Sequence, residues 1–272
     1  MEVGYIMGEA INKFYISNAK TKSVDEWVDY SKKSIIYEVI KIINGRPLFY
    51  DEHYKRLVNS LKLKSESIRI NSKEMYDLIS ELVNKNQVLI GNIKIIYNLL
   101  DSDFRIFFIK HSYPNKEMYD QGVNVISYFG ERHNPNVKEM DVDFRSSVNK
   151  EIKNKGVYEA LLVDNKGLVT EGSRSNVFFI KGDTIYTSKS NAVLEGVTRT
   201  EILKEAEKNR ISIKEKDIKF KELEIYEAAF ISGTSPNILP IKKIDDKEFD
   251  VKNGIMRELM NKFDLRIKED VF

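Results

Sequence analysis

Four short stretches of the chain carry residue types that could act on a small charged molecule. Glu171 interrupts the apolar, β-branched run "LVTEGSRSNVFFI", and a carboxylate buried among strands needs a partner. Arg56 has the planar guanidinium that suits a phosphate or a carboxylate. Gly196, Val197 and Thr198 precede a helical pattern, and the unpaired N–H groups at a helix N-terminus bind anions. The hydroxyl-rich turn "SGTSPN" follows another apolar run.

Each stretch taken singly also fits an ordinary structural role. Thr198 could simply cap a helix, and small residues after a strand usually form only a turn. Arg56 could be a solvated charge on a helix, and Glu171 could sit at an exposed sheet edge. The stretches therefore gain meaning only in combination.

The first part of the chain, residues 1–115, is predicted to be an α/β domain. "SIIYEVIKIINGRPLFYDEH" predicts a hairpin around Asn44-Gly45, because a type I′ turn requires two positive φ angles. Asp51 and Ser72 are expected to cap two helices. Their buried stripes are expected to contain Leu57, Leu61, Leu63, Met75, Leu78, Ile79 and Leu82. Two further strands are predicted in "QVLIGNIKIIYNLL" and "FRIFFIKHS".

The remainder, residues 116–272, is predicted to be a β-rich domain. Polar residues, Pro114 and Gly122 mark a connection near residues 112–120. A strand in "VNVISYF" precedes a helix over residues 146–155 that should stop at Gly156. A meander of strands follows, interrupted by the helix pattern "TRTEILKEAEKNR".

Composition favours small-molecule chemistry. The 272 residues carry a net charge of +2, so neither a nucleic-acid footprint nor a polyacidic tail is indicated. No cysteine is present and histidine occurs three times, so we expect no metal site. The N-terminus lacks a signal-peptide pattern, and no apolar run approaches the ~20 residues of a membrane span. A cytoplasmic protein with no membrane partner is expected.

In their order and spacing, four blocks resemble the class IV (fold-type IV) pyridoxal-phosphate aminotransferases. These blocks are "YEVIKIINGRPLFYDEHYKRL", "YEALLVDNKGLVTEGSRSN", "LEGVTRTEIL" and "FISGTSPNILPI". The family contains branched-chain and D-amino-acid aminotransferases and aminodeoxychorismate lyases, and the "YEVIKIING" hairpin looks most like the D-amino-acid enzymes. The resemblance implies a two-domain α+β fold, with a small N-terminal α/β domain and a larger C-terminal β-rich pseudo-barrel, and a homodimer.

The resemblance also implies roles for individual residues around pyridoxal 5'-phosphate. Glu171 would pair with the pyridine nitrogen and keep it protonated, which makes the ring a better electron sink. The phosphate would be held by Arg56, Val197, Thr198 and Thr234. Leu194 would lie against the ring, with Ser175 and Asn176 near it.

Spacing within the family selects the lysine that forms the Schiff base. The family places it about 18 residues before the glycine that precedes the "YEA" strand, and counting back from Gly156 gives Lys138. Lys150, Lys153 and Lys155 are the alternatives, and they fall on a charged helical face that looks solvated.

Two departures from the family pattern bear on the substrate. Branched-chain members usually have a tyrosine five residues after the lysine, where this chain has Asp143. The Arg-Gly motif of the D-amino-acid group is replaced by "IIYNLLDSDFR". Arg132 or Arg145 is therefore predicted to meet the substrate carboxylate, and Tyr37 is a candidate wall of the site or an ordinary core tyrosine.

The function that follows is transfer of an amino group between an amino acid and a 2-oxo acid. Lys138 would hold the cofactor and move the proton between the substrate and the cofactor. A lyase that eliminates pyruvate from aminodeoxychorismate would use the same lysine and cofactor. A protein of the same fold without catalytic activity is a third possibility, and the joint presence of Lys138, Arg56 and Glu171 argues against it.

Overall fold

The computed structural model describes residues 9–30 and 34–272. The chain divides into two compact units. The first comprises Met1–Ser112, Val137–Met140 and Asp270–Phe272, and the second comprises Tyr113–Asn136 and Asp141–Glu269. The beginning of the chain, where no signal peptide is predicted, lies largely outside the described residues.

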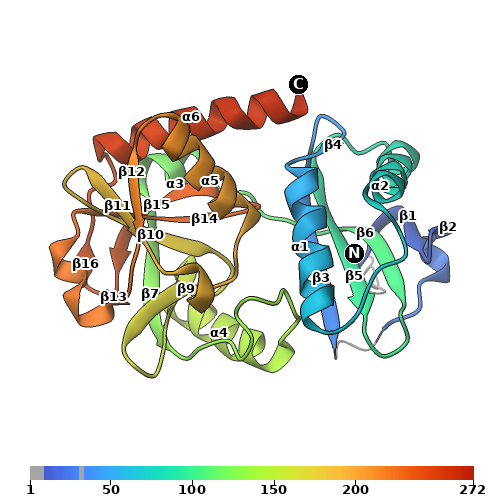
Figure 1. Ribbon diagram of the computed structural model, residues 1–272, viewed down its shortest axis with the longest axis horizontal. Coiled ribbons are helices and arrows are strands. Elements are labelled where there is room, and N and C mark those ends of the chain that lie inside the picture. Colours follow the sequence, from blue (N-terminus) through green and yellow to red (C-terminus); the bar gives the residue numbers. More distant parts are fainter. Residues whose placement is uncertain (1–8, 31–33) are drawn as a thin grey trace, which may run out of the picture. The chain divides into compact units, whose positions relative to one another are not determined.

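The first unit is built on an antiparallel sheet of six strands among its described residues, in the order β2-β1-β6-β5-β3-β4 (Figure 1). The strands are β1 (Ile11–Ser17), β2 (Lys20–Ser23), β3 (Ile35–Ile43), β4 (Arg46–Pro47), β5 (Gly91–Asn98) and β6 (Phe104–Ile109). Asn44 and Gly45, between β3 and β4, have φ angles of 54° and 76°. The predicted turn is therefore confirmed.

Two helices, α1 (Tyr50–Leu63) and α2 (Ser72–Asn86), pack on the sheet of this unit. The predicted caps are both wrong. Phe49, with a φ of 52°, precedes α1 and caps it with no side-chain hydrogen bond, while Asp51 is already helical. Asn71 caps α2 through a capping box with Glu74.

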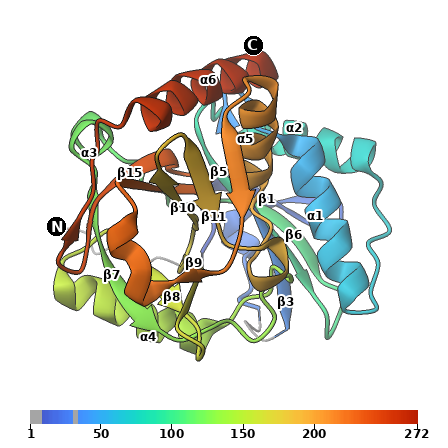
Figure 2. The same ribbon diagram turned by 60° about the vertical axis from the view of Figure 1, so that its left-hand side comes forward.

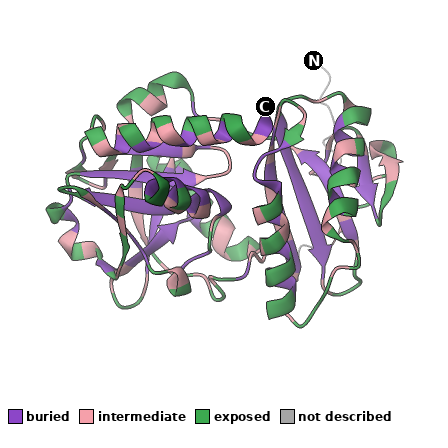
Figure 3. Ribbon diagram, turned by 45° about the horizontal axis from the view of Figure 1, so that its top comes forward, coloured by how far each residue is buried: buried purple, intermediate pink, exposed green. Residues whose placement is uncertain are grey.

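The apolar stripes of these helices follow the prediction with one exception. Leu57, Leu61, Met75, Ile79 and Leu82 are buried, and Leu78 is partly buried against the same core. Leu63 is 54% exposed and is the last residue of α1, where the helix leaves the core. Figure 3 shows the contrast between buried strands and the exposed outer sides of the helices.

A short segment far along the chain completes the edge of this sheet. Ile36 of β3 forms an antiparallel bridge with Glu139. Tyr37 donates its backbone N–H to the carbonyl of Lys138 at 3.0 Å, and Met140 donates to the carbonyl of Ile35 at 2.9 Å. Residues 137–140 therefore belong to the first unit although the flanking chain belongs to the second.

The second unit holds a ten-stranded mixed sheet among its described residues, in the order β12-β11-β10-β14-β15-β7-β8-β9-β13, with β16 paired to β15. The strands are β7 (Val123–Phe129), β8 (Glu159–Val163), β9 (Leu168–Gly172), β10 (Asn176–Lys181), β11 (Thr184–Thr187), β12 (Ser212–Glu215), β13 (Ile218–Lys219), β14 (Ala228–Gly233), β15 (Asn237–Ile244) and β16 (Lys247–Glu248). Together with the first unit, this architecture confirms the α+β class.

The helices of the second unit are α3 (Lys116–Gln121), α4 (Val142–Lys155), α5 (Val197–Lys208) and most of α6 (Gly254–Val271). α4 begins at Val142, not at residue 146 as predicted, and it ends as predicted at its C-cap Gly156, which has a φ of 62°. α5 and α6 lie side by side (Figure 2), joined by the Arg266–Glu201 ion pair at 3.0 Å. Among the described residues, no helix has the length and apolar character needed to cross a bilayer.

Candidate active site

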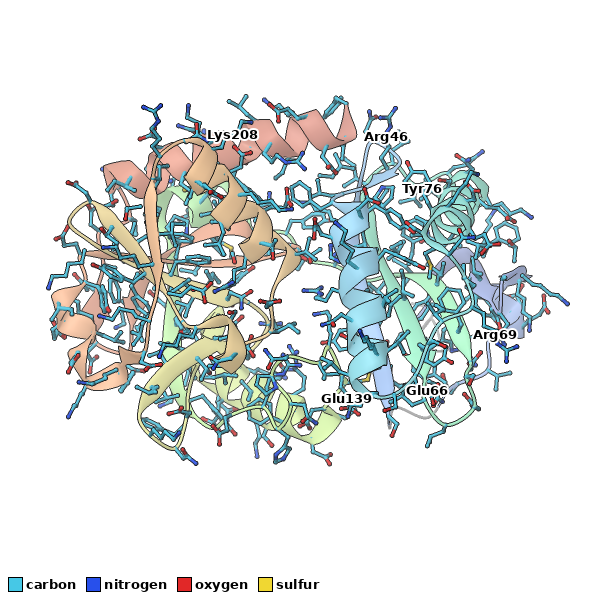
Figure 4. All side chains as sticks on the ribbon, viewed as in Figure 1. Arg46, Glu66, Arg69, Tyr76, Glu139 and Lys208 are labelled. Atoms are coloured by element: carbon cyan, nitrogen blue, oxygen red, sulfur yellow. The ribbon has the colours of Figure 1, made fainter. Side chains whose placement is uncertain are left out.

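Lys138 stands in the segment that extends the first unit's sheet. Its backbone N–H donates to Oγ of Ser60 at 3.3 Å, and its carbonyl accepts from Tyr37. Its ammonium nitrogen lies 4.8 Å from the centroid of the Tyr37 ring. Figure 4 labels the next residue, Glu139, near the end of α1, where it pairs with Lys64. The main chain around Lys138 is thus fixed on both sides.

Arg56 faces a buried carboxylate that the sequence analysis missed. Nε of Arg56 donates to Oε1 of Glu38 at 2.8 Å, and Nη2 donates to Oε2 at 2.6 Å. Nδ1 of His53 lies 2.8 Å from the same Oε2. Two features of the sequence could have identified Glu38. It occupies an inward position in the alternating apolar strand β3, and the helix that follows, α1, carries both His53 and Arg56.

Electrostatics keep this cluster in one protonation state. Burial alone would raise the pKa of Glu38, but the charge of Arg56 and the hydrogen bonds from Arg56 and His53 lower it to about 2. Burial lowers the pKa of His53, as do the charges of Arg56 and Lys138, against the opposing pull of Glu38. Glu38 is therefore ionised and His53 neutral at pH 7.

Glu171 lies at the end of β9 in the second unit and is 5% exposed. Its Oε2 accepts the backbone N–H of Leu194 at 3.2 Å, and its Oε1 accepts from Nη1 of Arg132 at 3.4 Å. Asn176 donates its side-chain N–H to the carbonyl of Leu194 at 2.9 Å. Four sequence-predicted residues, Arg132, Glu171, Asn176 and Leu194, are thereby brought together in one network.

The loop that carries Arg132 is tied to the loop that carries Leu194. Nδ2 of Asn136 donates to the carbonyls of Ser190 and Val193, each at 2.9 Å. A cavity of about 300 Å³ opens beside this network, and Arg132 and Glu171 are among its lining residues. The carboxylate of Glu171 is thus held in place by main-chain and side-chain donors.

A second buried acid, Glu159 of β8, fixes the turn that follows Glu171. Its two oxygens accept from Oγ of Ser173 at 2.6 Å, Oγ of Ser175 at 3.0 Å and the backbone N–H of Arg174 at 3.2 Å. Glu159 is 2% exposed. Glu159 was not predicted from the sequence, although an acid inside the apolar run "YEALLV" was a usable sign.

The start of α5 has no side-chain cap. Its N-cap residue is Gly196, which has no side chain to cap the first turn, followed by buried Val197 and Thr198. A Cβ at Gly196 would collide with Oδ1 of Asn176, so a larger residue there would displace the Asn176 side chain from its hydrogen bond to Leu194. Thr234 lies half-buried in the turn between β14 and β15.

The remaining predicted residues have simpler placements. Arg145 is half-buried on α4. Lys150, Lys153 and Lys155 lie exposed on the same helix, as expected of solvated lysines. Among the four lysines considered for the covalent link, Lys138 is thus the one that is partly buried.

Known proteins resemble this chain along most of its length. The family model described as "Amino-transferase class IV" matches residues 35–244. A D-alanine aminotransferase from Bacillus licheniformis is 29% identical over 224 residues, covering 77% of this chain and 78% of that protein. A branched-chain-amino-acid aminotransferase from Pseudomonas aeruginosa is 32% identical over 163 residues, covering 57% and 53%.

The fold agrees with that match. The branched-chain amino acid aminotransferase from Thermobaculum terrenum, whose structure was solved in its PLP form, superposes with a TM-score of 0.80 at 21% identity, covering 97% of this chain and 96% of that chain. Since the family model spans most of the chain and includes Arg56, Lys138 and Glu171, this protein belongs to the class IV aminotransferases.

Proposed function

We propose that Lys138 is the residue through which this class IV aminotransferase moves an amino group between an amino acid and a 2-oxo acid. The observation that carries the proposal is the position of Lys138. Its main chain is hydrogen-bonded to β3 and to Ser60, and its amine lies beside the Tyr37 ring. A lysine can serve both as the covalent link to a cofactor and as a base, and a main chain held in place keeps its amine in one region for both tasks.

The donor set fits pyridoxal 5'-phosphate, the cofactor of this class. A phosphate dianion suits the guanidinium of Arg56, the helix N-terminus at Val197 and Thr198, and the hydroxyl of Thr234. A protonated pyridine nitrogen suits Glu171, a buried carboxylate. When bound, the cofactor supplies the electron sink that makes the α-carbon of an amino acid acidic.

The chain's own residues then have distinct tasks. Nζ of Lys138 would act as the general base that moves the proton between the substrate α-carbon and C4′ of the cofactor. Glu171 would keep the ring nitrogen of the cofactor protonated, and Glu171 itself is held by hydrogen bonds from Leu194 and Arg132. Glu159 maintains the turn that contains Ser173 and Ser175.

Several finer assignments stay predictions from the sequence and the family resemblance. Tyr37 is assigned to the substrate side of Lys138, which its position beside the amine supports. Arg132 and Arg145 remain the candidates for the substrate carboxylate, although Arg132 also contacts Glu171. A homodimer and a cytoplasmic location also remain predictions.

A panel of substrates tests the proposed function. The purified protein, loaded with cofactor, would be mixed with single L- and D-amino acids, and conversion to the pyridoxamine form would be followed by absorbance. We expect conversion by some amino acids and reversal by 2-oxoglutarate. Pyruvate release from aminodeoxychorismate, with no conversion by any amino acid, would instead identify the lyase, and inertness toward both would identify a non-catalytic protein.

A further inference from the structure

The Arg56–Glu38 pair is a two-pronged contact deep inside the first unit. Nε and Nη2 of Arg56 reach Oε1 and Oε2 of Glu38 at 2.8 and 2.6 Å, and Glu38 is 0% exposed. Such a fork fixes the guanidinium plane as well as its position. The two prongs use two of the five N–H groups of a guanidinium, so up to three lie outside the fork.

Both carboxylate oxygens of Glu38 face hydrogen-bond donors, so each oxygen must act as an acceptor. His53 is neutral because burial lowers its pKa. With Glu38 ionised, Nδ1 of His53 must carry the ring proton and donate it to Oε2 at 2.8 Å. Oε2 therefore receives two donors, from His53 and Arg56, and Oε1 receives a third.

This arrangement also balances charge inside the first unit. Arg56 and Glu38 carry opposite charges, and their side chains are only 10% and 0% exposed. Leaving either charge alone in such surroundings is strongly unfavourable. Glu38 therefore lets a buried arginine keep one orientation permanently.

We infer that Glu38, supported by His53, is a positioning residue that presets Arg56 to receive the phosphate of the cofactor. The inference rests on the proposed role of Arg56 as a phosphate anchor. Glu38 itself touches neither cofactor nor substrate in this assignment. It acts by presenting the outer N–H groups of Arg56 in a fixed direction, so that the phosphate meets a guanidinium that needs no reorientation.

Replacing Glu38 by Gln should break the arrangement. An amide replaces one of the two carboxylate oxygens by an NH₂ group. At the Oε2 position this group would face Nη2 of Arg56 and Nδ1 of His53, and at the Oε1 position it would face Nε of Arg56. In either orientation an N–H group of Arg56 meets another donor. The guanidinium must then turn away from its present plane. Glu38→Asp keeps the charge but is one methylene shorter, so it should keep only part of the fork.

The test compares pyridoxal 5'-phosphate with pyridoxal, which lacks the phosphate. Each is titrated into the cofactor-free protein, and dissociation constants are measured for wild type, Glu38→Gln, Glu38→Asp, Arg56→Ala and the double variant. Asp103→Asn is the matched control, because Asp103 pairs with Arg105 at 2.6 Å in the same unit and has no proposed role. Circular dichroism establishes which variants are folded, and Glu38→Asp serves if Glu38→Gln does not fold.

We expect Glu38→Gln to weaken pyridoxal 5'-phosphate binding at least tenfold while pyridoxal binding stays within about twofold of wild type. Adding Glu38→Gln to Arg56→Ala should cause no further loss, and Asp103→Asn should match wild type. Equal weakening of both ligands, unchanged binding or tighter binding in Glu38→Gln would overturn the inference. If Arg56→Ala alone leaves phosphate discrimination intact, the anchor role in the proposed function fails, and the inference fails with it.

Discussion

The amine of Lys138 and the ring of Tyr37 face one another at 4.8 Å from nitrogen to ring centroid, on neighbouring extended segments that are hydrogen-bonded together. An aromatic face attracts an ammonium group by ~0.5–1 kcal/mol at an exposed site and by more when it is desolvated. Tyr37 therefore stabilises the charged form of Lys138 relative to the neutral amine, which is the nucleophile.

Tyr37→Leu should consequently make Lys138 more reactive in the cofactor-free protein. Loss of ~1 kcal/mol of stabilisation raises the neutral fraction about fivefold. Competitive acylation at pH 7 followed by peptide mass spectrometry measures this directly. Tyr37→Phe keeps the aromatic face and should match wild type. Equal labelling rates in wild type and Tyr37→Leu would show that the ring has no electrostatic influence on Lys138.

Glu171→Gln should retain the cofactor yet lose most turnover. A neutral amide can replace the hydrogen bond to the ring nitrogen but not the negative charge that keeps it protonated. Each unit lost from the pKa of that nitrogen corresponds to ~1.4 kcal/mol, a factor of ten, so we expect a loss of about tenfold or more. The comparison is kcat at saturating substrate together with the cofactor dissociation constant. Turnover like that of wild type would remove Glu171 from the mechanism.

Glu159→Gln should destabilise the second unit. The buried carboxylate of Glu159 accepts hydrogen bonds from two serine hydroxyls and from a backbone N–H. In the glutamine variant, the NH₂ group would replace one accepting oxygen and would face one or more of these donors. We expect the free energy of unfolding to fall by about 1.5–3 kcal/mol. Urea denaturation measures it, with Glu207→Gln on the exposed side of α5 as control. If the two variants are equally stable, Glu159 does not hold the turn.

His53 should make stability depend on pH in a defined direction. The pKa of His53 is lowered in the folded protein, whereas in the unfolded chain it is ~6.5. Below pH ~6.5 the unfolded chain therefore binds a proton at His53 more readily than the folded chain does, which favours unfolding. Its contribution is therefore fully present above pH ~6.5 and is lost as the pH falls. The gap in unfolding free energy between wild type and His53→Asn should shrink between about pH 7.5 and about pH 5.5. A gap that stays constant over that range would mean that His53 does not titrate differently on folding.

Local signals in the sequence predicted local structure well. The Asn44-Gly45 turn and the end of α4 at Gly156 depend on φ angles that few residues adopt, so they could be located from the residues alone. The cap at Ser72 was misplaced because Asn71, another good capping residue, directly precedes it. The cap at Asp51 was misplaced because α1 begins after Phe49 with no side-chain cap at all. For α6 no prediction was made, although Met256, Leu259, Phe263 and Ile267 recur at helical spacing and are buried.

Contacts between residues far apart in the chain could not be predicted from the sequence. The sequence pointed to Arg56 and Glu171 through resemblance, but their partners Glu38 and Arg132 lie 18 and 39 positions away. A periodic pattern specifies which side of a strand is buried, not which side chain of another element it meets. The return of residues 137–140 to the first unit is of the same kind, since it depends on an edge of β3 being open.

The covalent role of Lys138 can be tested most directly by trapping. Unmutated protein loaded with pyridoxal 5'-phosphate is reduced with borohydride, digested, and searched by peptide mass spectrometry for a pyridoxyl group on lysine. The position of Lys138 predicts a single major adduct on that residue, and none on Lys150, which is exposed on α4. A major adduct on any other lysine would contradict the account and would overturn the assignment of Lys138 from its spacing to Gly156.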